Sequence, residues 1–281
     1  MMRKFFWVIV FSALSTASYS QSSEIGVMIG GAGYKGDLNP HLFTPKFLGP
    51  SAGLFYRRSF NSFWSLRLGL SIASIKASDA VANDDYQRVR NLSFRNGIID
   101  GSALFEFNFF PFQTASESSN KITPFIFSGI SFFRHNPKAY YGGSWHELQP
   151  LGTEGQGSGL PGTESKYKRF QFALPIGGGI KVWLSKRFSL TVEAGARRTY
   201  TDYLDDVSTV YPDNLQLAAT NGALAAALSD RSVLQQTDLN ANRQRGTEAD
   251  KDWYMMGGLT INWTLSKKYS DRCKPFRTKL R

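Results

Sequence analysis

Hydrophobic and polar positions alternate along most of this chain with a period of two residues. The clearest segment is 253–265, where Trp253, Met255 and Gly257 begin one face and the other face becomes polar from Thr260 onward. Such alternation is typical of a β-strand with one apolar face. It also predicts strands at 170–184, 188–196, 66–72 and 103–109, with weaker patterns at 24–34, 51–60 and 122–134.

About eight strands are predicted, each near or above the roughly 9–11 residues that cross a bilayer as a tilted strand. Short connections at 61–62, 112–120 and 185–187 alternate with long ones at 35–49, 76–96, 135–168 and 202–251. Outer-membrane barrels alternate tight periplasmic turns with long extracellular loops in this way. The sequence therefore predicts an all-β fold, an eight-stranded antiparallel transmembrane β-barrel with short periplasmic turns and long extracellular loops. A soluble β-sandwich is the alternative.

The lumen of an eight-stranded barrel is filled by side chains, so a pore is disfavoured. Charged residues of both signs stand on the polar faces of the predicted strands, where opposite charges can pair. The predicted lumen charge network consists of Arg67, Glu106, Lys181, Glu193 and Arg197.

The N-terminus predicts a signal peptide over residues 1–20. Arg3 and Lys4 precede a short apolar run at 5–13, and the small residues Ser18 and Ser20 stand before the expected cleavage site. A retained anchor helix is the alternative. The rest of the chain divides into a barrel at 21–265 and a basic tail at 266–281. An even number of strands in the outer membrane places both termini in the periplasm.

Composition narrows the functional classes. The 281 residues carry a net charge of +11 and include one cysteine and three histidines. A single cysteine excludes a disulfide-stapled scaffold, and three histidines leave little room for a His-based metal cluster. Residues 266–281 hold seven basic residues against one acidic residue, so much of the basicity belongs to the tail. Export and the absence of a basic helix argue against nucleic-acid binding.

The tail is a candidate docking segment. Cys273 has no partner within the chain, and a leftover cysteine in an exported protein suggests intermolecular pairing. The predicted partner-binding residues are Cys273, Lys267, Lys268, Arg272, Lys274, Phe276 and Arg277. A disordered basic tail with an incidental thiol is the alternative.

Other constellations have simpler structural interpretations. Ser144, His146 and Glu147 could serve a lipid-modifying enzyme, but they lie in a glycine-rich loop and are interpreted as a polar loop cluster. His41 and His135 stand beside prolines or turns and are interpreted as structural. Three aspartates are possible calcium ligands but are interpreted as residues of a strand-to-loop transition: Asp202, Asp205 and Asp206. Two glycine clusters, at 30–33 and 177–179, lie within strands and suit close packing rather than phosphate binding. We expect no catalytic residue, cofactor or metal.

Two long loops have distinct compositions. The loop 135–168 holds seven glycines between 141 and 162 and is predicted to be flexible. In the loop 202–251, an Ala/Leu-rich stretch at 214–228 predicts a helix that begins after Pro212 and Asp213. This helix could cover the barrel mouth, dock on a neighbour, or only order its own loop.

Four segments resemble a known family. The start of the barrel, from Glu24 through the glycines to Asp37, is similar to the first strand of small outer-membrane barrels of Bacteroidota. Residues 198–208 (RTYTDYLDDVS) resemble a motif of the PorG-like barrels of the type IX secretion system, and Arg245-Gly246 and 251–254 fit the same pattern. The resemblance runs over 24–265, and TDYLDDVS is its most specific part.

This resemblance implies a non-enzymatic role. PorG-like barrels are accessory outer-membrane components that associate with a periplasmic ring, built from a lipoprotein (PorK or GldK type) and its partner subunit (PorN or GldN type). The residues themselves offer a route, because a periplasmic basic tail with Cys273 could hold a ring subunit at the membrane, including by a disulfide. Outer-membrane lipid is the other expected partner, and no nucleic acid or small-molecule substrate is expected. A lipid-modifying enzyme and a surface binding or adhesion barrel are the alternatives.

Overall fold

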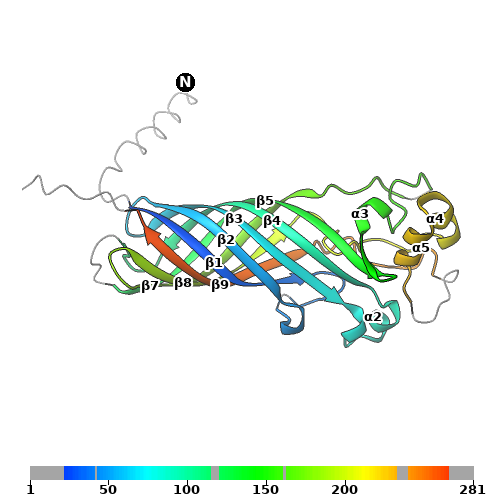
Figure 1. The fold of residues 1–281 in the computed structure, drawn as a ribbon, viewed down its shortest axis with the longest axis horizontal. Coiled ribbons are helices and arrows are strands. Elements are labelled where there is room, and N and C mark those ends of the chain that lie inside the picture. Colours follow the sequence, from blue (N-terminus) through cyan, green and yellow to red (C-terminus); the bar gives the residue numbers. More distant parts are fainter. Residues whose placement is uncertain (1–21, 42, 115–119, 161–162, 233–239, 266–281) are drawn as a thin grey trace, which may run out of the picture.

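The structure is a computed structural model that describes residues 22–41, 43–114, 120–160, 163–232 and 240–265. Each barrel strand pairs antiparallel with its neighbours, and β1 pairs with β9, so the sheet closes on itself (Figure 1). The predicted eight-stranded antiparallel barrel is confirmed. Its strands are β1 (Ser22–Lys35), β2 (Gly49–Ser59), β3 (Trp64–Ser78), β4 (Ser93–Asn108), β5 (Ile122–Tyr141), β7 (Phe170–Trp183), β8 (Phe188–Thr199) and β9 (Trp253–Thr264).

The two ends of the barrel differ in the length of their connections. At one end, here called the turn end, the strands are joined by the segments 60–63, 109–121 and 184–187. The opposite end, here called the loop end, carries the helices of the described residues and a short ninth strand (Figure 1). These elements are η1 (Pro45–Phe47), η2 (Asp79–Val81), α2 (Asp85–Arg90), β6 (Ser144–Glu147), α3 (Leu148–Leu151), α4 (Asn214–Asn221) and α5 (Ala223–Ser229).

The strands are longer at the loop end than the alternation predicts. The predicted connection 76–96 shrinks to 79–92, because β3 and β4 continue into it. Likewise, β5 continues through His135 to Tyr141, in a segment that we predicted to be loop. Outward positions there hold Gly97 and Asn136 rather than large apolar residues, so the apolar face that marks a strand in the sequence ends before the strand itself does.

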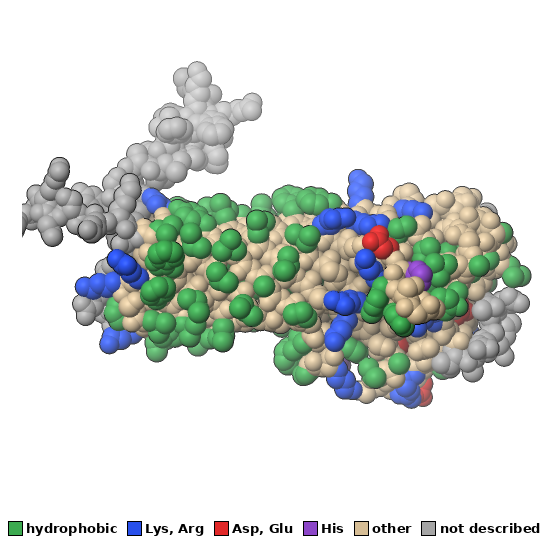
Figure 2. All heavy atoms as spheres, viewed as in Figure 1, with side chains coloured by type: hydrophobic (Ala, Val, Ile, Leu, Met, Phe, Trp, Pro, Cys, Tyr) green, Lys and Arg blue, Asp and Glu red, His purple; other side chains and the backbone are tan. Residues whose placement is uncertain are grey.

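The outside of the barrel is apolar over the part nearer the turn end (Figure 2). Outward side chains such as Ile29, Leu70 and Ile176 are 60–70% exposed, which is unusual for large aliphatic residues in contact with water. An apolar exterior of this kind suits a closed barrel surrounded by lipid. None of the helices among the described residues is long and apolar enough to cross a membrane.

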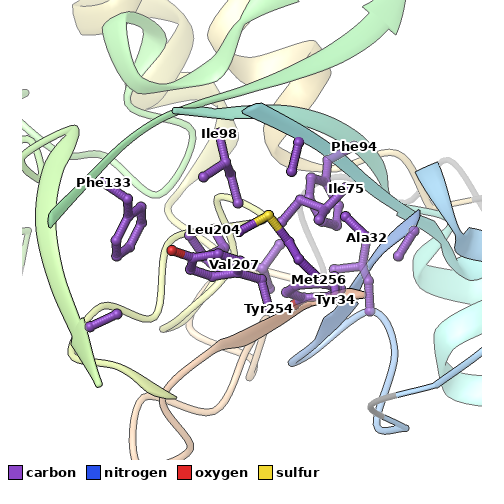
Figure 3. Close-up of a cluster of buried hydrophobic side chains, with 14 of the residues drawn as sticks. Ala32, Tyr34, Ile75, Phe94, Ile98, Phe133, Leu204, Val207, Tyr254 and Met256 are labelled. Carbon is purple, nitrogen blue, oxygen red and sulfur yellow. The ribbon is translucent and has the colours of Figure 1, made fainter. Parts of the chain in front are cut away.

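The interior has two zones. Near the turn end it is lined by charged side chains, described below. Near the loop end it holds an apolar core in which residues of several strands, among them Ile75, Ile98 and Met256, surround side chains of the loop that follows β8 (Figure 3). Gly30 and Gly257 lie inside strands that approach closely, since a Cβ at Gly30 would be 1.9 Å from the Gly257 carbonyl oxygen. Close packing therefore explains this glycine cluster.

The predicted helix at 214–228 forms as two helices. Asp213 accepts hydrogen bonds from the backbone N–H groups of Leu215 and Gln216, so α4 begins where the sequence predicts. Gly222, with a φ of 97°, ends α4 and begins α5. Leu228 of α5 packs against α3 and the end of β5, so this helix covers part of the loop end.

The described part of the glycine-rich loop uses several glycines with positive φ. Gly142 and Gly143 form the turn between β5 and β6, both with positive φ. Gly152, Gly155 and Gly157 also have positive φ, a conformation that residues with a side chain rarely adopt. The glycines therefore permit a tightly folded loop.

Candidate functional site

A buried network of charges fills the lumen near the turn end, with Glu106 at its centre. The Glu106 carboxylate lies 2.8 Å from Nε of Arg57, 2.9 Å from Nε of Arg67 and 2.7 Å from Nζ of Lys181. All four side chains are almost fully buried. One carboxylate therefore neutralises part of the charge on three cations.

Two further acids complete the network. Glu24 lies 2.8 Å from Arg57, and Glu193 lies 2.7 Å from Arg67. Three carboxylates thus balance three cations, and the Phe55 ring lies 4.9–5.0 Å from both guanidinium groups. Since burying charges is favourable only when each is paired, this balance lets the barrel fill its lumen with ionic side chains.

The structure brings together four of the five residues predicted for the lumen: Arg67, Glu106, Lys181 and Glu193. Arg197 is also buried but lies apart, with its Nε 3.7 Å from Asp100. Our sequence interpretation missed Arg57, Glu24 and Asp100. All three lie at positions of their strands whose side chains point inward, so the alternation of the sequence would have identified them as lumen residues.

The loop after β8 forms a plug in the mouth of the barrel, here called the mouth plug (residues 200–209). Leu204 and Val207 are completely or almost completely buried in the apolar core (Figure 3). Nδ2 of Asn96 donates to the Leu204 carbonyl oxygen at 2.7 Å, and the Asp252 carboxylate accepts from the Leu204 N–H at 2.8 Å. The motif TDYLDDVS is therefore an internal structural element.

The aspartates of the mouth plug accept hydrogen bonds from different partners. Asp205 accepts from the Tyr34 hydroxyl and from the Val207 N–H. Asp206 instead accepts from two side chains of the glycine-rich loop, Thr153 at 2.5 Å and Tyr167 at 2.6 Å. Among the described residues, no group of three His, Cys, Asp or Glu side chains is arranged to hold a metal ion.

A second buried ion pair holds the loops of this end together. Nη1 of Arg245 lies 2.8 Å from Glu154, and it also donates to the Asp206 carbonyl oxygen at 2.6 Å. Glu154 in turn accepts from the backbone N–H of Ser208 at 2.9 Å. The adjacent Gly246 has room for no side chain, since a Cβ there would lie 2.6 Å from the Ser208 nitrogen. We call this assembly of 148–160, the mouth plug, α4, α5 and 240–252 the cap.

Burial changes the acidity of the carboxyl groups in the cap. It raises the pKa of Asp202 to about 8, and the neighbouring Asp37 carboxylate adds to the increase. An interaction with the Ser208 side chain lowers this pKa in part but does not offset the effect of burial. Burial and nearby acids likewise raise the pKa values of Asp205 and Asp252 well above their ordinary value.

We expect the cap to loosen as the pH rises from about 4 to about 8. The folded state holds the proton of Asp202 more tightly than the unfolded state, so its contribution is full below the ordinary pKa of 3.8 and is lost as the pH rises through about 8. The Asp202→Asn variant should lose the part of this pH dependence that Asp202 contributes and be more protected at pH 9, whereas the parts contributed by Asp205 and Asp252 should remain. Hydrogen exchange of residues 200–209, corrected for intrinsic rates, measures the effect. Exposed Asp250→Asn is the control, and equal behaviour of the two variants would contradict the assignment.

The Ser144 and His146 pair lies on the exposed hairpin of β5 and β6. The Ser144 hydroxyl is 2.8 Å from Nε2 of His146, but the same nitrogen is 3.1 Å from the Tyr141 carbonyl oxygen. Because a carbonyl oxygen only accepts, it favours a proton on Nε2, and a protonated Nε2 is unable to act as a base toward the hydroxyl. Glu147 pairs with Lys138 and Arg169 rather than with the histidine. This geometry does not favour a serine nucleophile.

Other predicted residues are placed as follows. His135 is buried, with Nε2 3.3 Å from the Lys168 carbonyl oxygen, whereas His41 is exposed. The predicted partner-binding residues of the tail, 267–277, lie outside the described residues. The chain enters and leaves the barrel side by side at the turn end, where the Leu265 N–H donates to the Ser23 carbonyl oxygen at 2.7 Å.

Several solved outer-membrane proteins are similar to this chain in overall topology. Neisserial surface protein A is 9% identical, with a TM-score of 0.43 over 87% of this chain and 98% of that one. Ail of Yersinia pestis is 10% identical, with a TM-score of 0.39 over 87% and 99%. OprG of Pseudomonas aeruginosa is 8% identical, with a TM-score of 0.34 over 86% and 93%.

The sequence gives one family match. No curated protein matches the chain. A family model described as a domain of unknown function, DUF6089, matches residues 3–147, which include the first four barrel strands and β5 with its hairpin. Because this match covers more than half of the sequence, the chain belongs to the DUF6089 family.

Proposed function

We propose that this barrel is a non-enzymatic outer-membrane component of the type IX secretion system. In this role it anchors or positions the periplasmic ring of a PorK or GldK type lipoprotein and its PorN or GldN type partner. The turn end faces the periplasm, and the cap faces the cell exterior. The proposal joins the resemblance in TDYLDDVS and its neighbouring motifs to the architecture of the barrel.

One structural observation carries the proposal. The barrel is filled by the lumen network and closed by the mouth plug, while both ends of the described chain leave the turn end together. A barrel with a filled lumen is suited to anchoring a partner protein at the membrane rather than to conducting solutes. The tail, 266–281, continues from Leu265 and would begin at the periplasmic surface, where Cys273 and its basic neighbours can meet a ring subunit.

We expect truncation after Leu265 to leave a folded barrel that no longer co-purifies with the ring. A tagged full-length protein, pulled down from outer membranes in mild detergent, should retain the ring lipoprotein or its partner, and the truncated protein should lose at least 90% of it. Heat-modifiable mobility on gels checks that the truncated barrel is folded. Normal co-purification after truncation would refute docking through the tail.

Cys273→Ser separates the covalent route from the ionic one. A disulfide gives a heavier band on non-reducing gels that this variant removes, whereas ionic docking survives the variant and weakens with salt. Either result supports docking by the tail. Recovery of the full-length barrel alone, from cells with an assembled ring, would refute the secretion role.

A surface binding barrel is the second candidate, favoured by an aromatic hairpin at the loop end. Tyr140 and Trp145 contact each other with ring centroids 5.5 Å apart, and both are about half exposed. Exposed aromatic residues are common binding anchors. Tyr140→Ala with Trp145→Ala tests this role without disturbing Glu154, which a deletion of the glycine-rich loop would remove. Loss of cell-surface binding with normal ring co-purification would favour this second function.

A further inference from the structure

The outward face of the barrel strands carries charges of one sign, whereas the inward face carries charges of both signs. Every acidic residue of the eight barrel strands faces inward: Glu24, Asp100, Glu106 and Glu193. Every charged residue that faces outward from these strands is a cation: Lys35, Arg58, Lys76, Arg95, Arg134, Lys138 and Arg198. Except for Arg58, these cations all lie near the loop end.

The outward cations form a collar around the barrel, here called the basic belt (Lys35, Lys76, Arg95, Arg134, Lys138 and Arg198). Register places them beside one another, since Lys76 pairs with Arg95 and Arg95 pairs with Lys138. On the other side of the barrel, Lys35 and Arg198 flank Trp253 across β1, β9 and β8. Figure 2 shows basic side chains gathered where the apolar part of the barrel meets the wider loop end.

The belt lies at the height expected for the outer headgroups of a membrane. From Ile25, the first large outward apolar residue of β1, to Lys35 is ten residues. At a rise of about 3.3 Å per residue and a strand tilt of about 40°, this distance is roughly 25 Å along the barrel axis, which matches the apolar band of outer-membrane barrels.

Most of these cations lack an acidic partner in the part of the chain that the structure describes. Lys138 pairs with Glu147 at 3.2 Å, and Arg95 reaches only the Ser74 hydroxyl at 3.4 Å. Lys35, Lys76, Arg134 and Arg198 are exposed and form no ion pair among the described residues. These positive charges therefore face the molecules that surround the barrel at this height.

A hollow beside β1, β8 and β9 could take a headgroup. Its volume is about 520 Å³, and Lys35, Arg198 and Lys251 line it together with Trp253. Asp37 and Asp250 also contribute to the lining, but Asp37 accepts a hydrogen bond from the Thr247 N–H at 3.1 Å. The cations in the hollow outnumber the acids.

We propose that the basic belt binds the phosphate groups of glycolipids in the outer leaflet of the outer membrane, with the hollow beside Trp253 as its principal site. Charge complementarity and the height of the belt above the turn-end edge of the apolar band support this partner. The inference rests on the outer-membrane location proposed above and is independent of the secretion role. An acidic protein partner is the competing occupant, and the test below separates the two.

The test measures binding of bisphosphorylated lipid A to the purified full-length protein in detergent, by native mass spectrometry. Lys35→Gln with Arg198→Gln should weaken binding about 30-fold, since each surface charge contributes about a five-fold effect. The matched control, Lys186→Gln with Arg187→Gln, removes two exposed cations at the turn end and should change binding less than two-fold. Dephosphorylated lipid A should bind both variants and the parent protein equally weakly.

Two results would overturn the inference: equal loss of binding in the belt and control variants, or equal affinity of the parent protein for both forms of lipid A. Unchanged lipid binding in the belt variant, with loss of an acidic protein from pull-downs, would assign the belt to a protein instead. Ring co-purification is measured in the same variants and should be unchanged. A failure of the secretion role would therefore leave this result standing, and the reverse also holds.

Discussion

Glu106→Gln is expected to destabilise the barrel by about 3–5 kcal/mol, because it leaves Arg57, Arg67 and Lys181 buried with too little negative charge. Glutamine keeps the size of the side chain and removes only its charge, so a cavity contributes little to the loss. Denaturant unfolding in detergent micelles, followed by tryptophan fluorescence and gel mobility, measures the change in the free energy of unfolding.

Two variants test the origin of this effect. Glu147→Gln removes an acid that also pairs with two cations but is 39% exposed, and we expect it to cost less than about 1 kcal/mol. Adding Lys181→Met to Glu106→Gln removes one of the excess cations and should restore part of the stability. Unfolding of Glu106→Gln at the same denaturant concentration as the parent would show that the network contributes no stability.

Arg245→Met is expected to unfold the cap while the barrel remains closed. The change leaves Glu154 buried without its counter-ion and removes the hydrogen bond to the Asp206 carbonyl oxygen, a local loss of about 3–5 kcal/mol. Hydrogen exchange should accelerate at least 100-fold in 148–158 and 204–230. Exchange in the strands nearer the turn end should be unchanged, because the lumen network does not involve this pair.

Controls for the cap follow from its geometry. Arg245→Lys keeps the charge and should lose only part of the protection, since lysine lacks the fixed fork of the guanidinium group. Arg88→Gln breaks an exposed pair with Asp85 and should leave exchange unchanged. Uniform acceleration across barrel and cap in Arg245→Met would show that the cap is not a separate unit of stability.

The fold could be predicted from sequence because lipid and lumen impose opposite polarities on successive residues. In β3, for example, Leu66, Leu68 and Leu70 face outward while Ser65 and Arg67 face inward, so the alternation is nearly complete. The same contrast marks Glu106 and Lys181 as lumen residues. The alternation shows which side chains point inward but not which charges meet across the lumen. The central position of Glu106 could therefore be seen only in the structure.

The cap could not be predicted in the same way. Glu154 and Arg245 are separated by 91 positions, and neither lies in a periodic segment. The glycines around Glu154 predicted flexibility, and composition could not show that Gly152, Gly155 and Gly157 adopt positive φ in a compact loop. We interpreted the aspartates of TDYLDDVS as residues of a strand-to-loop transition, and their hydrogen-bond partners Tyr34, Thr153 and Tyr167 could not be predicted because they come from distant parts of the chain.

The burial of paired charges on the inward face of the strands also constrains how the barrel assembles. A slip of one residue in the pairing of β3 would turn Arg67 toward lipid and bring Leu66 and Leu68 inside, and the same slip in β2 would turn Arg57 toward lipid. Arg57 and Arg67 lie toward the turn end, so each misplaced cation would cost less than the about 2–4 kcal/mol of a position at the bilayer midplane, but Glu106 would lose a partner as well. The ionic lumen therefore disfavours one-residue slips while the strands insert, because such slips expose these charges to lipid and separate them from their partners.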